Sequence, residues 1–231
     1  MDAVILDNIE AEINAEKLAR KLRIKRGSAI SWESFKSLVN EAVQIARPKA
    51  LYKMAYVDAA REEAVVLDGI ELRSLVLAVN LAEVQRVFPF VATCGSELAR
   101  WAMSKDDVVE RFWAEAIMDR ALFSAVHFLE EHIKQRYLVG KTAMLSPGSL
   151  DDWPVEEQSP LFSLLGDTEE HIGVRLTDSL MMDPVQSLSG ILFPVEVDFA
   201  ACQLCPRENC PKRRAPYDRE LYDKRFRLHK S

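Results

Sequence analysis

The sequence predicts an α+β fold with a mixed or antiparallel sheet and a long central helix. From residue 106 to residue 137, apolar side chains recur at helical spacing over an unusually long stretch. Several short segments rich in β-branched and aromatic residues are separated by charged and glycine-containing turns. The predicted helices and strands do not alternate regularly along the chain, as they would in a doubly wound parallel sheet.

In the first hundred residues we expect one helix and several strands. Residues 31–46 repeat apolar side chains every three or four positions, Ser31 is suited to cap this helix, and Arg47-Pro48 ends it. Segments 51–57 and 63–67 are predicted strands, whereas segment 70–79 fits either state. Segment 87–95 is a predicted buried strand, in which Pro89 indicates an edge position or a bulge.

The long helix over 106–137 is followed by Gly140, a residue type that commonly ends helices. Residues 145–154 form a loop by their turn chemistry, and two short helices over 157–166 and 167–172 follow. Segment 189–200 is a predicted strand. We expect the chain to divide into an α+β domain over residues 1–200 and a basic, cysteine-rich tail over residues 201–231.

The composition is that of a globular protein: 231 residues, 48% hydrophobic and 29% charged. No apolar run reaches the roughly 18 residues of a membrane span, and the acidic start lacks a signal pattern, so a cytoplasmic location is expected. From Arg207 onward nine Lys/Arg stand against four Asp/Glu, a net charge of +5, and the first 206 residues carry −11. The tail could be solvated, or bind the acidic body or an acidic partner; the same acidic body argues against nucleic acid.

Common catalytic signatures do not occur in this sequence. It has no GxGxxG, GxxxxGK[ST], GxSxG or HExxH motif, and His127 and His132 are five residues apart, so they do not share a helix face. Four carboxylates crowd segment 151–157, where a solvated loop is the simpler interpretation than an acid/base site. No side-chain nucleophile is evident.

Two stretches together resemble the activation domain of cobalamin-dependent methionine synthase. They are SPGSLDDWPVEEQ (146–158) and LTDSLMMDPVQSLSGILFP (176–194). The family has a P-G-Y-P loop, then a helix, then a T-E-S-x-x-M-x-P-x-x-S-x-S-G segment, in the same order and at similar spacing. The resemblance extends over about residues 85–195 and includes the long helix.

This resemblance implies a function in reductive reactivation. The family's domain docks over a corrinoid, presents S-adenosylmethionine, and lets a low-potential donor such as flavodoxin or ferredoxin reduce inert cob(II)alamin, which methyl transfer then traps. The implied partner is a corrinoid protein or the core of cobalamin-dependent methionine synthase, served in trans. The alternative is a non-catalytic docking or shielding partner of a corrinoid protein, with a structural zinc ion in its tail.

The resemblance also implies a site for S-adenosylmethionine on the two loops. Its residues are Ser146, Pro147 and Gly148 on the first loop and Ser187, Ser189 and Gly190 on the second. Met144 and Ser149 stand where the family has an arginine and a tyrosine that contact S-adenosylmethionine, and Phe123 stands where its long helix has a glutamate. We therefore expect weaker binding than is typical of the family.

The tail segment CQLCPRENCPKRRAPY (202–217) predicts a metal centre. The short loops of a C-x₂-C-x₄-C-P pattern can bring the thiolates of Cys202, Cys205 and Cys210 to one soft metal. We expect an oxygen-sensitive [4Fe–4S] cluster, with zinc as the alternative; reactive thiols or a disulfide stay open. Candidates for the fourth ligand are Cys94, then His229, then an open position, and the basic run Lys212–Arg214 would offset the thiolate charge.

Overall fold

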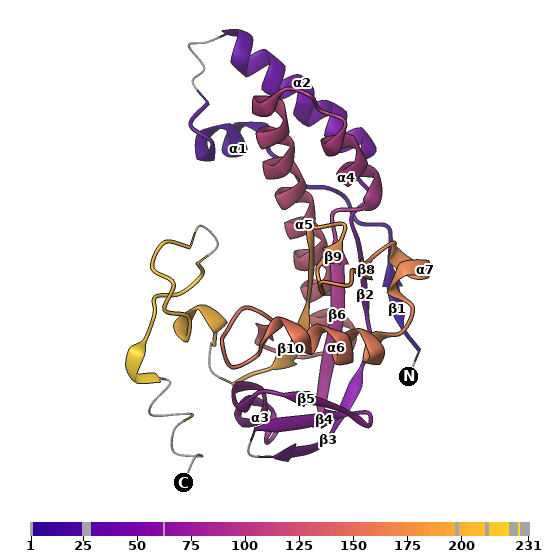
Figure 1. The fold of residues 1–231 in the computed structure, drawn as a ribbon, viewed down its shortest axis with the longest axis vertical. Helices are drawn as coiled ribbons and strands as arrows, with labels where there is room; N and C mark the ends of the chain where they lie inside the picture. Colours follow the sequence, from indigo (N-terminus) through magenta and orange to yellow (C-terminus); the bar gives the residue numbers. More distant parts are fainter. Residues whose placement is uncertain are drawn as a thin grey trace.

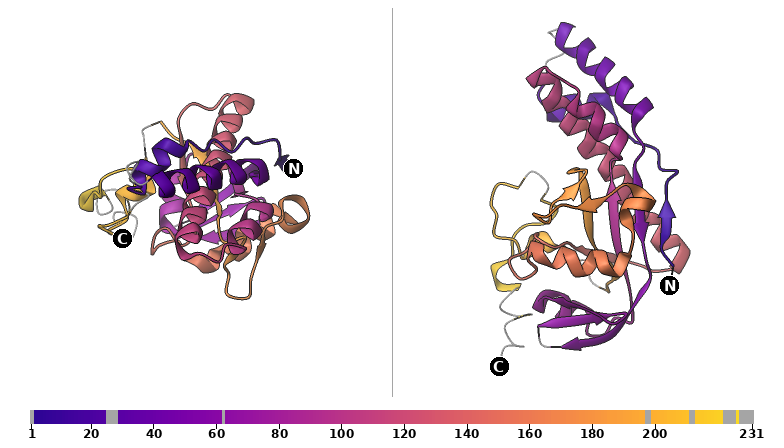
Figure 2. Two further views of the ribbon diagram at one scale, coloured as in Figure 1. Left: turned by 90° about the horizontal axis from the view of Figure 1, so that it is seen from above. Right: turned by 45° about the vertical axis from the view of Figure 1, so that its right-hand side comes forward.

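The computed structural model describes residues 2–24, 29–61, 63–196, 199–210, 213–221 and 226. The molecule is elongated, with helices gathered at one end, a sheet in the middle and a small β-meander with its own helix at the other end (Figure 1). The cysteine-rich tail lies along one side of the molecule in both side views (Figures 1 and 2). Within the described residues, no helix combines the length and the apolar character needed to cross a bilayer.

The sheet is antiparallel and is built around strand β6 (Arg86–Thr93). On one side β6 pairs with β10 (Ser187–Pro194), and β10 pairs in turn with β7 (Thr142–Leu145). On the other side it pairs with β2 (Lys49–Tyr52) and β3 (Ala55–Arg61). The remaining strands are β1 (Val4–Leu6), beside β2, and β4 (Ala64–Leu67) and β5 (Ile70–Arg73), which continue from β3. The predicted α+β class with an antiparallel sheet is confirmed.

Pro89 lies in the central strand, so its expected edge position is wrong. Lys53 N donates to the Pro89 carbonyl oxygen over 3.1 Å, and proline has no N–H with which to return the bond. This position falls in the interval between β2 and β3, both of which follow one register along β6 (Tyr52 with Phe90, Ala55 with Val87). The missing donor is thus accommodated by a local gap in the ladder.

One face of the sheet is covered by the long helix α5 (Val108–Tyr137). Helices α1 (Ala15–Lys21), α2 (Ala29–Ile45) and α4 (Ser96–Met103) join it at one end of the molecule, where α2 runs across the front in the left view of Figure 2. Phe35 of α2 meets Trp113 of α5 edge-on, with ring centroids 5.4 Å apart. The helices predicted over 31–46 and 106–137 are confirmed, although α5 ends at Tyr137, with Leu138 as its C-cap in the left-handed region, and not at Gly140.

The opposite face is covered by α3 (Leu75–Leu81), α6 (Gln158–Leu165) and α7 (Thr168–Ile172). Segment 70–79 therefore holds both states: β5 ends at Arg73, and Ser74 caps α3 by accepting the Leu77 amide over 3.0 Å. The short elements are η1 (Val155–Glu157), β8 (Arg175–Leu176), β9 (Met182–Asp183) and η2 (Ala201–Gln203).

Carboxylates of the acidic segment 151–157 hold this region together. Asp152 Oδ2 accepts the Ser74 hydroxyl and the Val76 amide, the latter over 2.8 Å, and Glu157 Oε2 accepts the Arg73 amide over 2.7 Å. Negative charge at the start of α3 is favourable because the first amides of a helix lack partners. Part of the segment expected to be a solvated loop therefore has a structural role.

The described part of the tail packs onto the body of the protein. A second hydrophobic core lies between the sheet and the helices α3, α6 and α7. Leu204, Phe226 and Phe199 are buried in this second core. This docking brings the cysteine-rich loop toward α5 and β10.

Candidate functional site

A cavity of about 530 Å³ lies between α5, β7, the start of β10 and the tail. Its volume is within the roughly 300–1,000 Å³ typical of small-molecule sites. Each wall comes from a different part of the chain. The walls are Asp119, Leu122, Phe123, Val126 and Glu130 of α5; Thr142–Met144, Ser146 and Ser149 of β7 and the loop after it; 185–188 and Leu192; and 199–202 with Arg214 from the tail.

The segment leading into β10 is held rigidly at the cavity. It contains a cis peptide bond between Asp183 and Pro184. Ser187 Oγ donates to the Pro184 carbonyl oxygen over 2.7 Å and lies 3.0 Å from Thr93 Oγ1. The Gln186 carbonyl accepts the amide of Cys94 over 3.1 Å. These bonds fix the backbone of residues 185–188, which lines the cavity.

Ser189 and Gly190 of β10 do not line the cavity. Ser189 is 2% exposed, and its hydroxyl donates to Gln158 Oε1 over 3.2 Å. A Cβ atom at Gly190 would lie 2.4 Å from the Leu145 carbonyl oxygen and 2.9 Å from Ser146 Oγ. Glycine is therefore required here because the β7 backbone and the first loop approach β10 closely.

Two of the six site residues expected from the sequence line the cavity, namely Ser146 and Ser187. Pro147 and Gly148 belong to the turn that shapes the first loop, in which Gly148 N donates to the Trp153 carbonyl oxygen over 2.7 Å and Gly148 has a φ of 75°. Ser189 bonds to Gln158, and Gly190 allows the close approach of β7. The three positions at which the sequence departs from the family, Phe123, Met144 and Ser149, all line the cavity.

The charged residues of the cavity wall are of both signs. Glu130 Oε1 accepts the Thr142 hydroxyl over 2.8 Å and lies 3.0 Å from Lys134 Nζ. Burial, the largest single influence, raises the pKa of Glu130, but hydrogen bonds from Lys134 and Thr142 and the charges of Lys134 and Arg214 together hold this pKa below its usual value. Glu130 therefore stays ionised beside the cavity at neutral pH.

Tail residues complete the cavity, although the sequence predicts only a metal centre for this segment. Cys202 lines the cavity, and its Sγ accepts the Arg214 amide over 3.3 Å. The Arg213 guanidinium donates to the carbonyl oxygens of four residues of the same loop. They are Cys202 (2.9 Å), Cys205 (3.1 Å), Ala215 (3.2 Å) and Arg207. Arg213 thereby fastens the cysteine-containing loop into one compact turn.

The predicted metal ligands Cys94, Cys202 and Cys205 occupy different surroundings. Cys94 is fully buried in the core under α5, and burial raises the pKa of its thiol to about 12. Cys205 packs against the second core, whereas Cys202 faces the cavity. Within the described ranges, no three Cys, His, Asp or Glu side chains are placed to share a metal ion. His229 and Lys212 lie outside those ranges, and the cluster stays a prediction.

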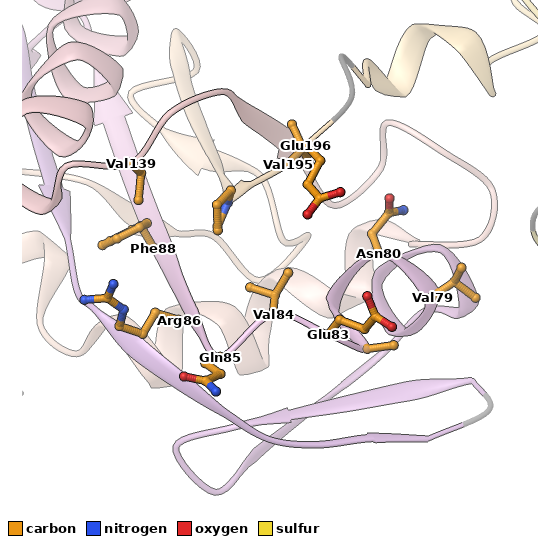
Figure 3. A pocket seen from close by; sticks show the side chains of 12 residues that line it. Val79, Asn80, Glu83, Val84, Gln85, Arg86, Phe88, Val139, Val195 and Glu196 are labelled. Carbon is orange, nitrogen blue, oxygen red and sulfur yellow. The ribbon is translucent and has the colours of Figure 1, made fainter.

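A second cavity, of about 860 Å³, lies at the other end of β10 (Figure 3). Val84, Phe88 and Val195 contribute apolar side chains to it, and Glu83 and Glu196 carry carboxylates at its rim. Although this cavity is larger, it contains none of the site residues expected from the sequence. The smaller cavity is therefore the candidate site, because the loop after β7 and the segment leading into β10 meet there.

Residues 84–203 match the family described as "Vitamin B12 dependent methionine synthase, activation domain". The chain belongs to this family. The matched segment includes β6, α5, both loops of the cavity and the first cysteine of the tail. The resemblance noted in the sequence is confirmed.

The structure is also similar to a crystal structure of the MetH reactivation domain bound to AdoHcy. The similarity covers 87% of this chain and 81% of that chain, with a TM-score of 0.63 and 15% sequence identity. At this identity the comparison shows that the two share a fold. A search of curated proteins found no match.

Proposed function

We propose that this chain reactivates a cobalamin-dependent methyltransferase in trans, and that the cavity of about 530 Å³ is its S-adenosylmethionine site. One observation carries the proposal. The first loop and the segment before β10, about forty residues apart in sequence, meet at one cavity against the long helix. The similar reactivation domain was crystallised with AdoHcy, which is S-adenosylmethionine without its methyl group.

The wall chemistry fits a ligand of this class. Hydroxyls of Thr142, Ser146 and Ser149 and the backbone of residues 185–188 offer hydrogen bonds, and Leu122, Val126 and Leu192 offer apolar contact. The Glu130 carboxylate provides the negative charge that a sulfonium or ammonium group requires. The bound ligand would supply the methyl cation equivalent that traps a partner's cobalt once a low-potential donor, such as flavodoxin or ferredoxin, has reduced it from cob(II) to cob(I).

The proposal is tested on a separate corrinoid protein poised in the cob(II) state. A low-potential reductant and S-adenosylmethionine are added, and methylcob(III)alamin is followed by visible absorbance with and without this chain. We expect the chain to accelerate methylation only when S-adenosylmethionine is present. An unchanged rate across several corrinoid partners, including cobalamin-dependent methionine synthase without its own activation domain, would refute the proposed function.

The metal bound by the tail distinguishes the two functional hypotheses, a reactivating protein and a docking or shielding partner. A [4Fe–4S] cluster on Cys202, Cys205 and Cys210 could pass electrons to the partner, whereas zinc would only fasten the tail. Anaerobic purification followed by iron, sulfide and zinc assays separates these cases. Stoichiometric zinc without iron, together with no acceleration of methylation, would favour the docking or shielding partner.

A further inference from the structure

We propose that Arg214, on the cysteine-rich tail, binds the carboxylate of the ligand in the cavity. The inference rests on the proposed function, because it takes the ligand to be an S-adenosyl amino acid. It assigns the tail a role in ligand recognition that is separate from metal binding.

Arg214 carries the positive charge that such a ligand needs. The amino-acid end of S-adenosylmethionine is a zwitterion, so its site must satisfy an ammonium and a carboxylate group. Among the lining residues that the structure describes, Arg214 is the only Lys or Arg, and Asp119 and Glu130 carry the opposite charge. Met144, at the position where the resemblance implies an arginine, cannot bind an anion.

The guanidinium of Arg214 is available for a ligand. Its charge acts on Glu130, but Glu130 already has hydrogen bonds from Thr142 and Lys134. Within the described part of the chain, the Arg214 side chain has no hydrogen bond or ion pair of its own. Its planar set of N–H donors matches the two oxygens of a carboxylate, and a lysine ammonium would not match them in the same bidentate way.

The backbone under Arg214 is positioned before any ligand arrives. The Arg214 amide donates to Cys202 Sγ, and the neighbouring Arg213 side chain ties the loop together through its carbonyl oxygens. The Asp218 amide donates to the Gln203 carbonyl over 2.8 Å, and Leu204 is buried in the second core. Fixing this loop lowers the ordering cost that a ligand contact from a free tail would incur.

The test compares two ligands that differ only at the amino-acid end. AdoHcy carries the carboxylate, whereas 5′-methylthioadenosine lacks the whole amino-acid group. Both are titrated calorimetrically into the unaltered full chain, Arg214→Ala, Arg214→Lys and the control Arg219→Ala, which removes an exposed arginine elsewhere on the tail. Circular dichroism checks that each variant is folded.

We expect Arg214→Ala to weaken AdoHcy binding by about tenfold or more and to leave 5′-methylthioadenosine binding within about twofold. Arg214→Lys should fall between Arg214→Ala and the unaltered chain, and Arg219→Ala should match the unaltered chain. Unchanged AdoHcy binding in Arg214→Ala would overturn the inference while leaving the proposed site intact. Equal weakening of both ligands would overturn it too, because Arg214 would then only shape the wall. If neither nucleoside binds the unaltered protein, the ligand assigned under the proposed function is itself wrong.

Discussion

Replacing Gly190 by alanine should destabilise the fold and disturb the candidate site together. The added Cβ would lie 2.4 Å from the Leu145 carbonyl oxygen, 2.9 Å from Ser146 Oγ and 3.2 Å from Phe90 Cε1. Ser146 Oγ can rotate away, but the Leu145 carbonyl belongs to β7, which is paired with β10 at the next residue, Ile191. The strand pair must therefore separate locally to admit the methyl group.

The expected cost follows from the kind of contact. Inserting an extra methyl group into a packed interior costs about 1–3 kcal/mol, and contact with a backbone atom that cannot rotate away places Gly190→Ala near about 3 kcal/mol. For a chain of this size, each kcal/mol lowers the melting temperature by about 2–4 °C, so a decrease of about 6–12 °C is expected. Since Ser146 lines the cavity, AdoHcy affinity should fall as well.

Gly140→Ala is the matched control, because nothing lies within 4 Å of a Cβ atom at Gly140. Thermal unfolding followed by circular dichroism and urea titration of both variants give the two free energies of unfolding. The control should stay within about 1 kcal/mol of the unaltered protein. A Gly190→Ala variant that stays within about 0.5 kcal/mol of the unaltered protein would show that β7 and β10 admit the methyl group without separating, since changes of that size are ordinary for surface positions.

Three further predictions concern individual side chains. Asp152→Ala removes the carboxylate that accepts the Ser74 hydroxyl and the Val76 amide, so urea unfolding should show a loss of about 1–2 kcal/mol, and the exposed Asp151→Ala should show almost none. In the metal-free protein at pH 8, alkylation should modify the three tail thiols and reach Cys94 only after unfolding, because Cys94 is fully buried and its pKa is raised to about 12. Rapid alkylation of Cys94 in the folded protein would contradict its burial in the core. Burial, with a smaller effect of the Arg136 charge, lowers the pKa of His132 from 6.5. The unfolded chain therefore binds this proton more readily, and the free energy of unfolding should decline as the pH falls below about 6.5. Urea unfolding at pH 7.5 and 5.5 should show a smaller decline for His132→Gln than for the unaltered protein.

The sequence was sufficient to predict the helices that pack one continuous apolar face against the rest of the protein. The long helix and the helix over 31–46 are amphipathic over many turns, so their extent could be predicted within a few residues. The start of α3 was ambiguous in the sequence, because segment 70–79 fits either state and part of what holds its first turn is Asp152, 78 residues after Ser74. The edge position predicted from Pro89 was wrong for a similar reason. A strand tolerates a missing N–H where the neighbouring strand ends, and β2 ends opposite Pro89.

The candidate site also divides into parts that local sequence patterns predict and parts that depend on contacts between distant segments. Ser146 and Ser187 could be predicted to lie close together because their loops have a recognisable order and spacing, and the antiparallel strands β7 and β10 bring these loops to one cavity. Cys202 and Arg214 line the cavity in a tail whose Leu204 and Phe226 are buried in the core that contains α6. The charge asymmetry of the sequence allows the basic tail to bind the acidic body, but no local pattern indicates which tail residues would be buried or which would reach the cavity.

The structure specifies what the predicted cluster would require of the tail. Thiolates that share one metal centre must converge within a few ångströms, whereas Cys202 faces the cavity and Cys205 packs against the second core. Convergence would change the Arg213 contacts to the carbonyl oxygens of Cys202 and Cys205, and with them the position of Arg214, whose amide bonds to Cys202 Sγ. We therefore expect metal loading to change the affinity of the cavity for AdoHcy, measured calorimetrically under anaerobic conditions on metal-free and reconstituted protein. Equal affinities in a protein shown to carry stoichiometric metal would mean that the metal centre and the cavity are independent, and that Arg214 keeps its place when the thiolates converge.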